Sequence, residues 1–128
     1  MKYLLDTQAL LWITNNDPKL SAKVKNLFLN QDNDMDVSMA TIWEMSVKIS
    51  LQKLFIPGNI ADFVRDHIRG NQINIMKIEL AHIYQLENLK FYHRDPFDRL
   101  IISQALAESI PIISYDKMFD KYPIRRVW

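Results

Sequence analysis

The segment between residues 93 and 116, HRDPFDRLIISQALAESIPIISYD, constrains the fold of this chain more than any other. Asp95 followed by Pro96 predicts a helix start, because aspartate is a favoured N-cap and proline fits the first helical turn. The helix continues through RLIISQALAES until a proline stops it, and the β-branched run IIS then predicts a short strand. We therefore expect a helix and a strand with Asp98 at the start of the helix and Asp116 just beyond the strand.

Short apolar runs alternate with helical patterns along the rest of the chain. Strands are predicted at Lys2–Asp6, Asp36–Met39, Ile73–Ile78, Ile112–Ser114 and Ile124–Trp128. Helices are predicted over Thr7–Thr14, after Ser21, over Thr41–Lys53, after Asn59, over Glu79–Leu89 and after Asp95. Strands that alternate with helices favour a parallel sheet covered on both faces. We therefore predict an α/β fold with a central, mainly parallel sheet of four to five strands, in a single domain spanning residues 1–128.

The composition excludes several classes of function. The absence of cysteine rules out disulfides, thiolate zinc sites and a cysteine nucleophile. The two glycines, Gly58 and Gly70, are too few for a phosphate-binding loop or a dinucleotide-binding motif. A formal net charge of +1 provides no global field for nucleic acid, so any basic surface must be local. With no signal peptide and no apolar run of membrane-spanning length, the sequence predicts a cytoplasmic protein without membrane contact.

Four acids from distant parts of the chain are predicted at the same kind of structural location, the carboxyl end of a strand or the helical turn after it. They are Asp6, Glu44, Asp98 and Asp116. Ligands of open α/β sheets bind at these strand ends. Carboxylates that lie close together repel one another unless some are protonated or a cation neutralises them. Oxygen ligands without cysteine or paired histidines suit Mg²⁺ or Mn²⁺, and two such ions suit in-line attack on a phosphodiester.

Each of these acids also has a purely structural interpretation. Asp6 and Asp116 could cap a helix or occupy a turn, and Asp98 could interact with the positive end of its helix. Thr41 and Glu44 fit a capping box, in which the glutamate side chain accepts a hydrogen bond from the threonine backbone. The conjunction of four acids favours the metal site over the separate interpretations.

Four stretches of the chain resemble the PIN domain, and in particular the VapC toxins of bacterial toxin–antitoxin pairs. They are LLDTQALLW, ATIWEMSVK, HRDPFDRLIISQA and IISYDKMF, in that order along the chain. The resemblance implies a PIN-like three-layer α/β/α sandwich and a Mg²⁺- or Mn²⁺-dependent endoribonuclease. It also implies a homodimer and a small cognate antitoxin whose C-terminal segment occupies the groove over the active site.

The resemblance assigns roles to individual residues. It matches the family's acidic quartet to Asp6, Glu44, Asp98 and Asp116. Asp95 is an accessory candidate whose preferred role is the helix cap. Ser114 stands where many relatives have threonine, and its hydroxyl is a candidate to orient a water or a metal ligand.

The sequence thus predicts an RNA phosphodiesterase in which carboxylates bind one or two divalent ions and a metal-activated water attacks in line. Contacts to the RNA backbone are predicted for Lys48, Arg94, Arg99 and Lys117. For Lys48, pairing with Glu44 across one helical turn is the default interpretation, and the lysine could also hold phosphate or order the site. His93 adjoins the predicted site and is expected to be a loop residue, with contact to the substrate as the alternative interpretation. Two alternatives stay open: a PIN nuclease that processes RNA or cleaves DNA flaps, and a noncatalytic interaction module whose acids are caps and surface pairs.

Overall fold

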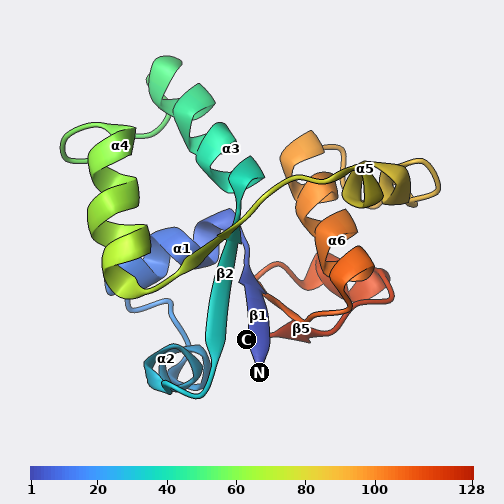
Figure 1. Ribbon diagram of the computed structural model, residues 1–128, viewed down its shortest axis with the longest axis horizontal. Helices are drawn as coiled ribbons and strands as arrows, with labels where there is room; N and C mark the ends of the chain where they lie inside the picture. Colours follow the sequence, from blue (N-terminus) through green and yellow to red (C-terminus); the bar gives the residue numbers. More distant parts are fainter.

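A five-stranded sheet in which every strand runs parallel to its neighbours forms the centre of the computed structural model, which describes residues 1–128 (Figure 1). The strand order is β3-β2-β1-β4-β5. The strands are β1 (Lys2–Leu5), β2 (Asp34–Ser38), β3 (Asn74–Met76), β4 (Ile112–Ile113) and β5 (Arg126–Val127). All five predicted strands are present, and the predicted mainly parallel sheet is confirmed.

Helices connect the strands. They are α1 (Thr7–Thr14), α2 (Ala22–Leu29), α3 (Met39–Ser50), α4 (Ile60–Phe63), α5 (Leu80–Leu86) and α6 (Pro96–Glu108). The helical path of α4 continues through a π-helical turn at Val64–Ile68 and a short 3₁₀ turn at Arg69–Asn71, and a second 3₁₀ helix spans Lys117–Lys121. No helix is long and apolar enough to cross a membrane.

Successive strand residues point to opposite faces of the sheet, and each face has its own apolar core. On one face, Leu5 of β1 packs with Leu10 of α1 and Val24 of α2. On the other face, Leu4 of β1 packs with Ile101 of α6. Figure 1 shows α1, α2 and α4 on one side of the sheet and α5 and α6 on the other. The three-layer α/β/α sandwich is therefore confirmed.

The start of α3 corrects one sequence-based interpretation. This helix begins at Met39, because the Ser38 hydroxyl caps it by accepting a hydrogen bond from the Ala40 N–H at 2.9 Å. Thr41 and Glu44 therefore lie inside the helix and not at its N-cap. The capping box that was the alternative interpretation of these two residues is therefore excluded, and the Glu44 carboxylate is available for other contacts.

Candidate active site

The acidic residues meet at the point where the strand order changes direction. The chain passes outward from β1 through β2 to β3, and then places β4 and β5 on the other side of β1. Loops diverge at such a switch point and leave a crevice at the carboxyl ends of the strands. A cleft of about 370 Å³ lies here. Its lining includes five carboxylates: Asp6, Glu44, Asp95, Asp98 and Asp116. The predicted acids do not point to separate regions of the surface.

Asp6 directly follows β1 and is both a helix cap and a member of the cleft. Its Oδ1 atom accepts a hydrogen bond from the Ala9 N–H at 2.7 Å, which caps α1. The Ser114 hydroxyl, at the end of the neighbouring strand β4, hydrogen-bonds to the Asp6 carboxylate. The same hydroxyl accepts the Asp116 N–H at 3.0 Å. Ser114 therefore connects the acids that follow β1 and β4.

Glu44 lies one turn into α3 and is buried, with 4% of its surface exposed. Its Oε1 atom accepts a hydrogen bond from the Thr7 hydroxyl at 2.7 Å, and its Oε2 atom accepts one from Lys48 Nζ at 2.6 Å. The Thr41 hydroxyl lies 3.0 Å from the Thr7 hydroxyl. These contacts join α1 to α3 across the cleft. They also confirm the predicted Glu44–Lys48 pair across one helical turn.

Asp95 and Asp98 lie at the start of α6. The Oδ1 atom of Asp95 accepts hydrogen bonds from the Phe97 N–H at 2.8 Å and the Asp98 N–H at 3.2 Å, so the predicted N-cap is confirmed. Pro96 follows at the first helical position, where its missing N–H leaves no hydrogen bond unmade. The cap turns the Asp98 side chain into the cleft from the first helical turn.

Asp116 follows β4 and is held at both carboxylate oxygens. Its Oδ1 atom accepts the Met118 N–H at 2.9 Å, which caps the 3₁₀ helix Lys117–Lys121. Its Oδ2 atom lies 2.8 Å from Nε2 of His93. The Asp116 side chain remains 43% exposed. It is therefore oriented by the protein while still open to the cleft.

The cleft is electrostatically costly for its own carboxylates. Burial, together with the negative charges of Asp95 and Glu44, raises the pKa of Asp98 to about 7. Burial likewise raises the pKa of Asp6 to about 6, although its hydrogen bonds from Ser114 and Ala9 oppose the shift. Only two ammonium groups, Lys48 and Lys53, line the same cleft. A bound cation would relieve this excess of negative charge.

The donor chemistry of the cleft fits a divalent cation with oxygen ligands. Five carboxylates and the Thr7 hydroxyl provide hard oxygen donors, and no histidine nitrogen or thiolate lines the cleft. In the present side-chain conformations, however, no three Asp, Glu or His side chains are grouped closely enough to hold one ion. The carboxylates therefore share one cleft without forming a closed ligand set. Both oxygens of Glu44 are engaged, by Thr7 and Lys48.

The basic residues predicted to contact RNA differ in their surroundings. Lys48 lines the cleft, and Arg94 and Lys117 are exposed next to Asp95 and Asp116 in the sequence. Arg99 is different because it is buried, with 7% of its surface exposed. Its guanidinium donates hydrogen bonds to three backbone carbonyls, those of Leu89, Lys90 and His93. The predicted RNA contact of Arg99 is therefore wrong, since its donors are used inside the protein.

Two residues contact acids of the site in ways that the sequence did not predict. Thr7 bonds Glu44, and His93 bonds Asp116. Thr7 directly follows Asp6, but a threonine at a helix start gives no separate signal. His93 was expected to be a loop residue, which it is, but the loop folds back and buries its ring. Adjacency to the DPFDR motif was the one available signal.

Comparisons with known proteins agree with this geometry. The family model of the PIN domain matches residues 3–124. Among solved structures, VapBC2 of Rickettsia felis bound to a promoter DNA fragment has a TM-score of 0.74 at 18% identity, covering 99% of this chain and 98% of that chain. DNA-bound VapBC of Salmonella typhimurium has a TM-score of 0.74 at 18% identity, covering 99% and 97%. VapBC-1 of nontypeable Haemophilus influenzae has a TM-score of 0.70 at 19% identity, with 99% and 97% covered.

No significant match exists among curated proteins. The fold and site define a three-layer α/β/α domain whose acidic cleft lies at the topological switch point of a parallel sheet. This chain belongs to the PIN domain family. The PIN-domain resemblance predicted from the sequence motifs is confirmed, and the fold is that of the VapBC structures.

Proposed function

We propose that this protein is a Mg²⁺- or Mn²⁺-dependent endoribonuclease that hydrolyses RNA phosphodiester bonds and is the toxin of a toxin–antitoxin pair. The observation that carries the proposal is the convergence of Asp6, Glu44, Asp98 and Asp116, from four separate segments, on one cleft of a PIN domain. Carboxylates in such a cleft suit a divalent ion, and such ions suit phosphodiester hydrolysis.

The side chains of the cleft have defined parts in the proposed mechanism. Asp6, Asp98 and Asp116 would hold the ion, with Glu44 completing the acidic set. A bound ion would supply Lewis-acid chemistry, activating water and stabilising charge on the phosphate oxygens. Ser114 orients Asp6 and the backbone of Asp116 through its hydroxyl. The raised pKa values of Asp6 and Asp98 indicate that this pocket disfavours uncompensated negative charge.

Three basic side chains would guide the RNA backbone toward the cleft. They are Lys48, Arg94 and Lys117. Lys48 orders the site by its ion pair with Glu44. Its ammonium group would also contact a phosphate of the bound RNA. Contacts of this kind are sequence-independent and weaken as salt rises.

The proposal includes two protein partners. The similar structures from Rickettsia felis and Haemophilus influenzae are VapBC complexes, and this likeness supports a cognate antitoxin for the present chain. We also propose that the protein acts in the cytoplasm as a homodimer, as its resemblance to VapC toxins implies.

The proposal predicts that Asp98→Asn abolishes RNA cleavage while the protein stays folded. The substitution removes a charge but keeps the shape of the side chain, so cleavage of a labelled single-stranded RNA should fall at least about 100-fold. Asp34→Asn is the matched control, because Asp34 is an exposed acid at the opposite end of β2. Cleavage should also stop in EDTA and return with Mn²⁺.

Full activity of Asp98→Asn, with contaminating nuclease excluded, would overturn the assignment. A flap DNA cleaved in preference to RNA would instead support the alternative PIN nuclease. Calorimetry without site-specific uptake of Mg²⁺ or Mn²⁺ would support the noncatalytic module. Growth arrest on induction in a bacterial host, relieved by a co-expressed antitoxin, would separate a toxin from a processing nuclease.

A further inference from the structure

His93 occupies an unusual place for a loop histidine. It lies in the connection between α5 and α6, yet only 9% of its surface is exposed. Its ring stacks on Tyr122, with 5.6 Å between ring centroids, and packs against Phe119 at 4.7 Å. From this buried position Nε2 reaches the Oδ2 atom of Asp116 at 2.8 Å. The ring is thus held between the aromatic rings of Phe119 and Tyr122 on one side and the Asp116 carboxylate on the other.

The hydrogen bonds around the ring determine which nitrogen carries the proton. The Tyr122 hydroxyl accepts the backbone N–H of His93 at 2.9 Å, which leaves its own hydrogen free to donate to Nδ1 at 3.0 Å. Nδ1 is then an acceptor, and the neutral ring carries its hydrogen on Nε2. The opposite tautomer would place a lone pair of Nε2 against a carboxylate oxygen. Both contacts therefore assign the Nε2–H form, which donates to Asp116.

The loop that carries His93 is anchored by the motif that follows it. Arg99, buried on α6, donates to the backbone carbonyl of His93 at 3.3 Å and to those of Leu89 and Lys90 at 3.1 and 3.0 Å. Asp95, two residues after His93, caps the same helix. The backbone is thus held on both sides of the histidine, so the ring has little freedom to leave Asp116.

We infer that His93 is a positioning residue for Asp116, holding the Oδ2 atom of that carboxylate through Nε2–H so that its orientation toward the cleft is set before any ligand binds. The Met118 N–H holds the other oxygen. Buried groups that orient a metal-binding carboxylate commonly contribute 10- to 100-fold to metal affinity or activity (order of magnitude). The inference rests on the proposed function, since it assigns Asp116 to the metal-binding cleft.

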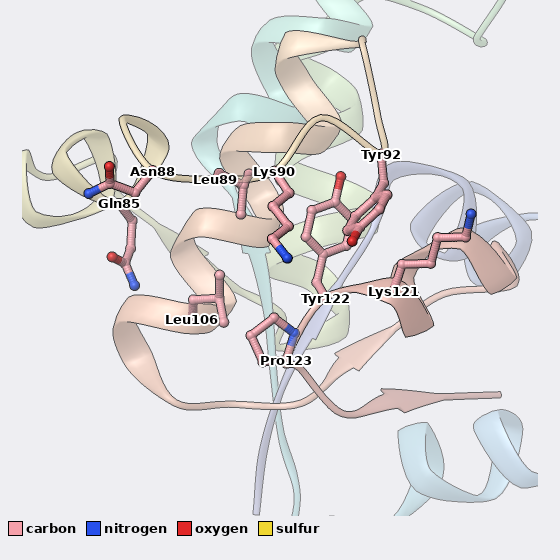
Figure 2. Close-up of a pocket in the computed structure, with 9 residues that line it drawn as sticks. All are labelled: Gln85, Asn88, Leu89, Lys90, Tyr92, Leu106, Lys121, Tyr122 and Pro123. Atoms are coloured by element: carbon pink, nitrogen blue, oxygen red, sulfur yellow. The ribbon is translucent and has the colours of Figure 1, made fainter.

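Tyr122 offers a way to test the chain of contacts without disturbing the packing. Its ring lines a cavity of about 300 Å³, where Figure 2 shows it side by side with Tyr92. The two rings meet edge to face at 5.2 Å. Tyr122→Phe removes the contact at Nδ1, leaves the contact of Nε2 with Asp116, and keeps the ring in this cavity wall.

The experiment compares His93→Leu with His93→Gln. Leucine fills part of the ring volume without a donor, whereas the glutamine amide can place an N–H close to the position of Nε2. We expect His93→Leu to lower both Mn²⁺ affinity, measured by calorimetry, and kcat for RNA cleavage by about 10- to 100-fold, with little change in KM. His93→Gln should recover most of both losses. His67→Leu, which changes an exposed histidine, is the matched control.

Nuclear magnetic resonance of ¹⁵N-labelled histidine provides a readout that is independent of activity. The wild-type His93 ring should show the Nε2–H tautomer, and Tyr122→Phe should keep it, because the Asp116 carboxylate still accepts from Nε2. Thermal unfolding of each variant shows whether it is folded. Unchanged Mn²⁺ affinity in folded His93→Leu, or an Nδ1–H tautomer in the wild type, would overturn the inference alone. A wild-type protein that neither binds Mn²⁺ nor cleaves RNA would overturn the proposed function and this inference together.

Discussion

At the scale of single residues, the cleft gathers side chains whose charges are unfavourable where they lie. Asp6 is 7% exposed and the pKa of its carboxyl group is raised, chiefly by burial. Asp98 shows the same direction of shift with an added contribution from neighbouring carboxylates. Neither shift is typical of a simple helix cap, whose hydrogen bonds from backbone N–H groups favour the charged form. These residues therefore lower the stability of the metal-free protein near neutral pH.

This predicts that the metal-free protein becomes less stable as pH rises from about 4 to about 8. The Asp6 carboxyl has a pKa of 3.8 when unfolded and about 6 when folded, so the folded state prefers the protonated form. Its favourable contribution is complete below the unfolded pKa and is lost as pH rises through the folded value. From Asp6 alone the loss is about 3 kcal/mol, and Asp98 acts in the same direction up to about pH 7.

Urea unfolding in EDTA at pH 5 and pH 8 measures this effect. Asp6→Asn should reduce the pH dependence, because the amide keeps an oxygen for the Ala9 N–H but cannot titrate. A wild-type protein that is more stable at pH 8 than at pH 5 would contradict the prediction, as would an unchanged slope in the variant.

At the scale of secondary-structure elements, α6 combines helix initiation with construction of the site. Three residues of the HRDPFDR segment have different structural roles at the start of this helix. Asp95 caps the helix, Asp98 enters the cleft from the first turn, and Arg99 holds the preceding loop by its carbonyls. The helix start and the active-site acids are therefore parts of one local structure, and a change in the cap would also displace Asp98.

The N-cap can be tested separately from its charge. Asp95→Ala should lower the free energy of unfolding by about 1 kcal/mol, because the N–H groups of Phe97 and Asp98 lose their acceptor. Asp95→Asn should remain close to the wild type, since asparagine is an equally good N-cap. Urea unfolding of the three proteins at pH 7 gives the comparison. If Asp95→Asn lowered the free energy of unfolding as much as Asp95→Ala does, the carboxylate charge and not the cap would be the stabilising feature.

At the scale of the whole molecule, the parallel sheet separates two apolar cores and leaves its carboxyl edge for the site. Ile113 of β4 belongs to the core shared with α1, and Ile112 belongs to the core shared with α6. Because the strands are buried on both faces, β4 can be two residues long and still be held firmly. The rigid sheet then places the loops that carry Asp6 and Asp116 next to each other.

The core facing α6 should respond strongly to truncation. Ile101 is fully buried in α6, and Ile101→Ala should lower the free energy of unfolding by about 3 kcal/mol through lost contacts and a residual cavity. Leu80→Ala on α5 is the matched control, because Leu80 is 67% exposed, and the change should cost less than about 0.5 kcal/mol. Denaturant unfolding of both variants measures the difference. Equal effects would contradict the assignment of the core.

Local patterns predicted most of the elements and the residues that line the cleft. The Asp95–Pro96 helix start and the Glu44–Lys48 pair depend on neighbours within four residues, and both are confirmed. The capping box at Thr41 failed because Ser38, three residues earlier, is the stronger local cap. The surface role expected for Arg99 failed because burial depends on which carbonyls the folded loop brings to it.

By itself, then, the sequence determined the order of strands and helices, the parallel sheet and the acids at the carboxyl ends of its strands, since these follow from short-range propensity and periodicity. Only the tertiary structure decided that Thr7 would meet Glu44 and that His93 would meet Asp116, across separations of 37 and 23 residues. Such pairs are made by the packing of separate elements, and no local spacing encodes them. The same packing decided that the carboxylates share one cleft, although no three of them are grouped closely enough to coordinate one ion.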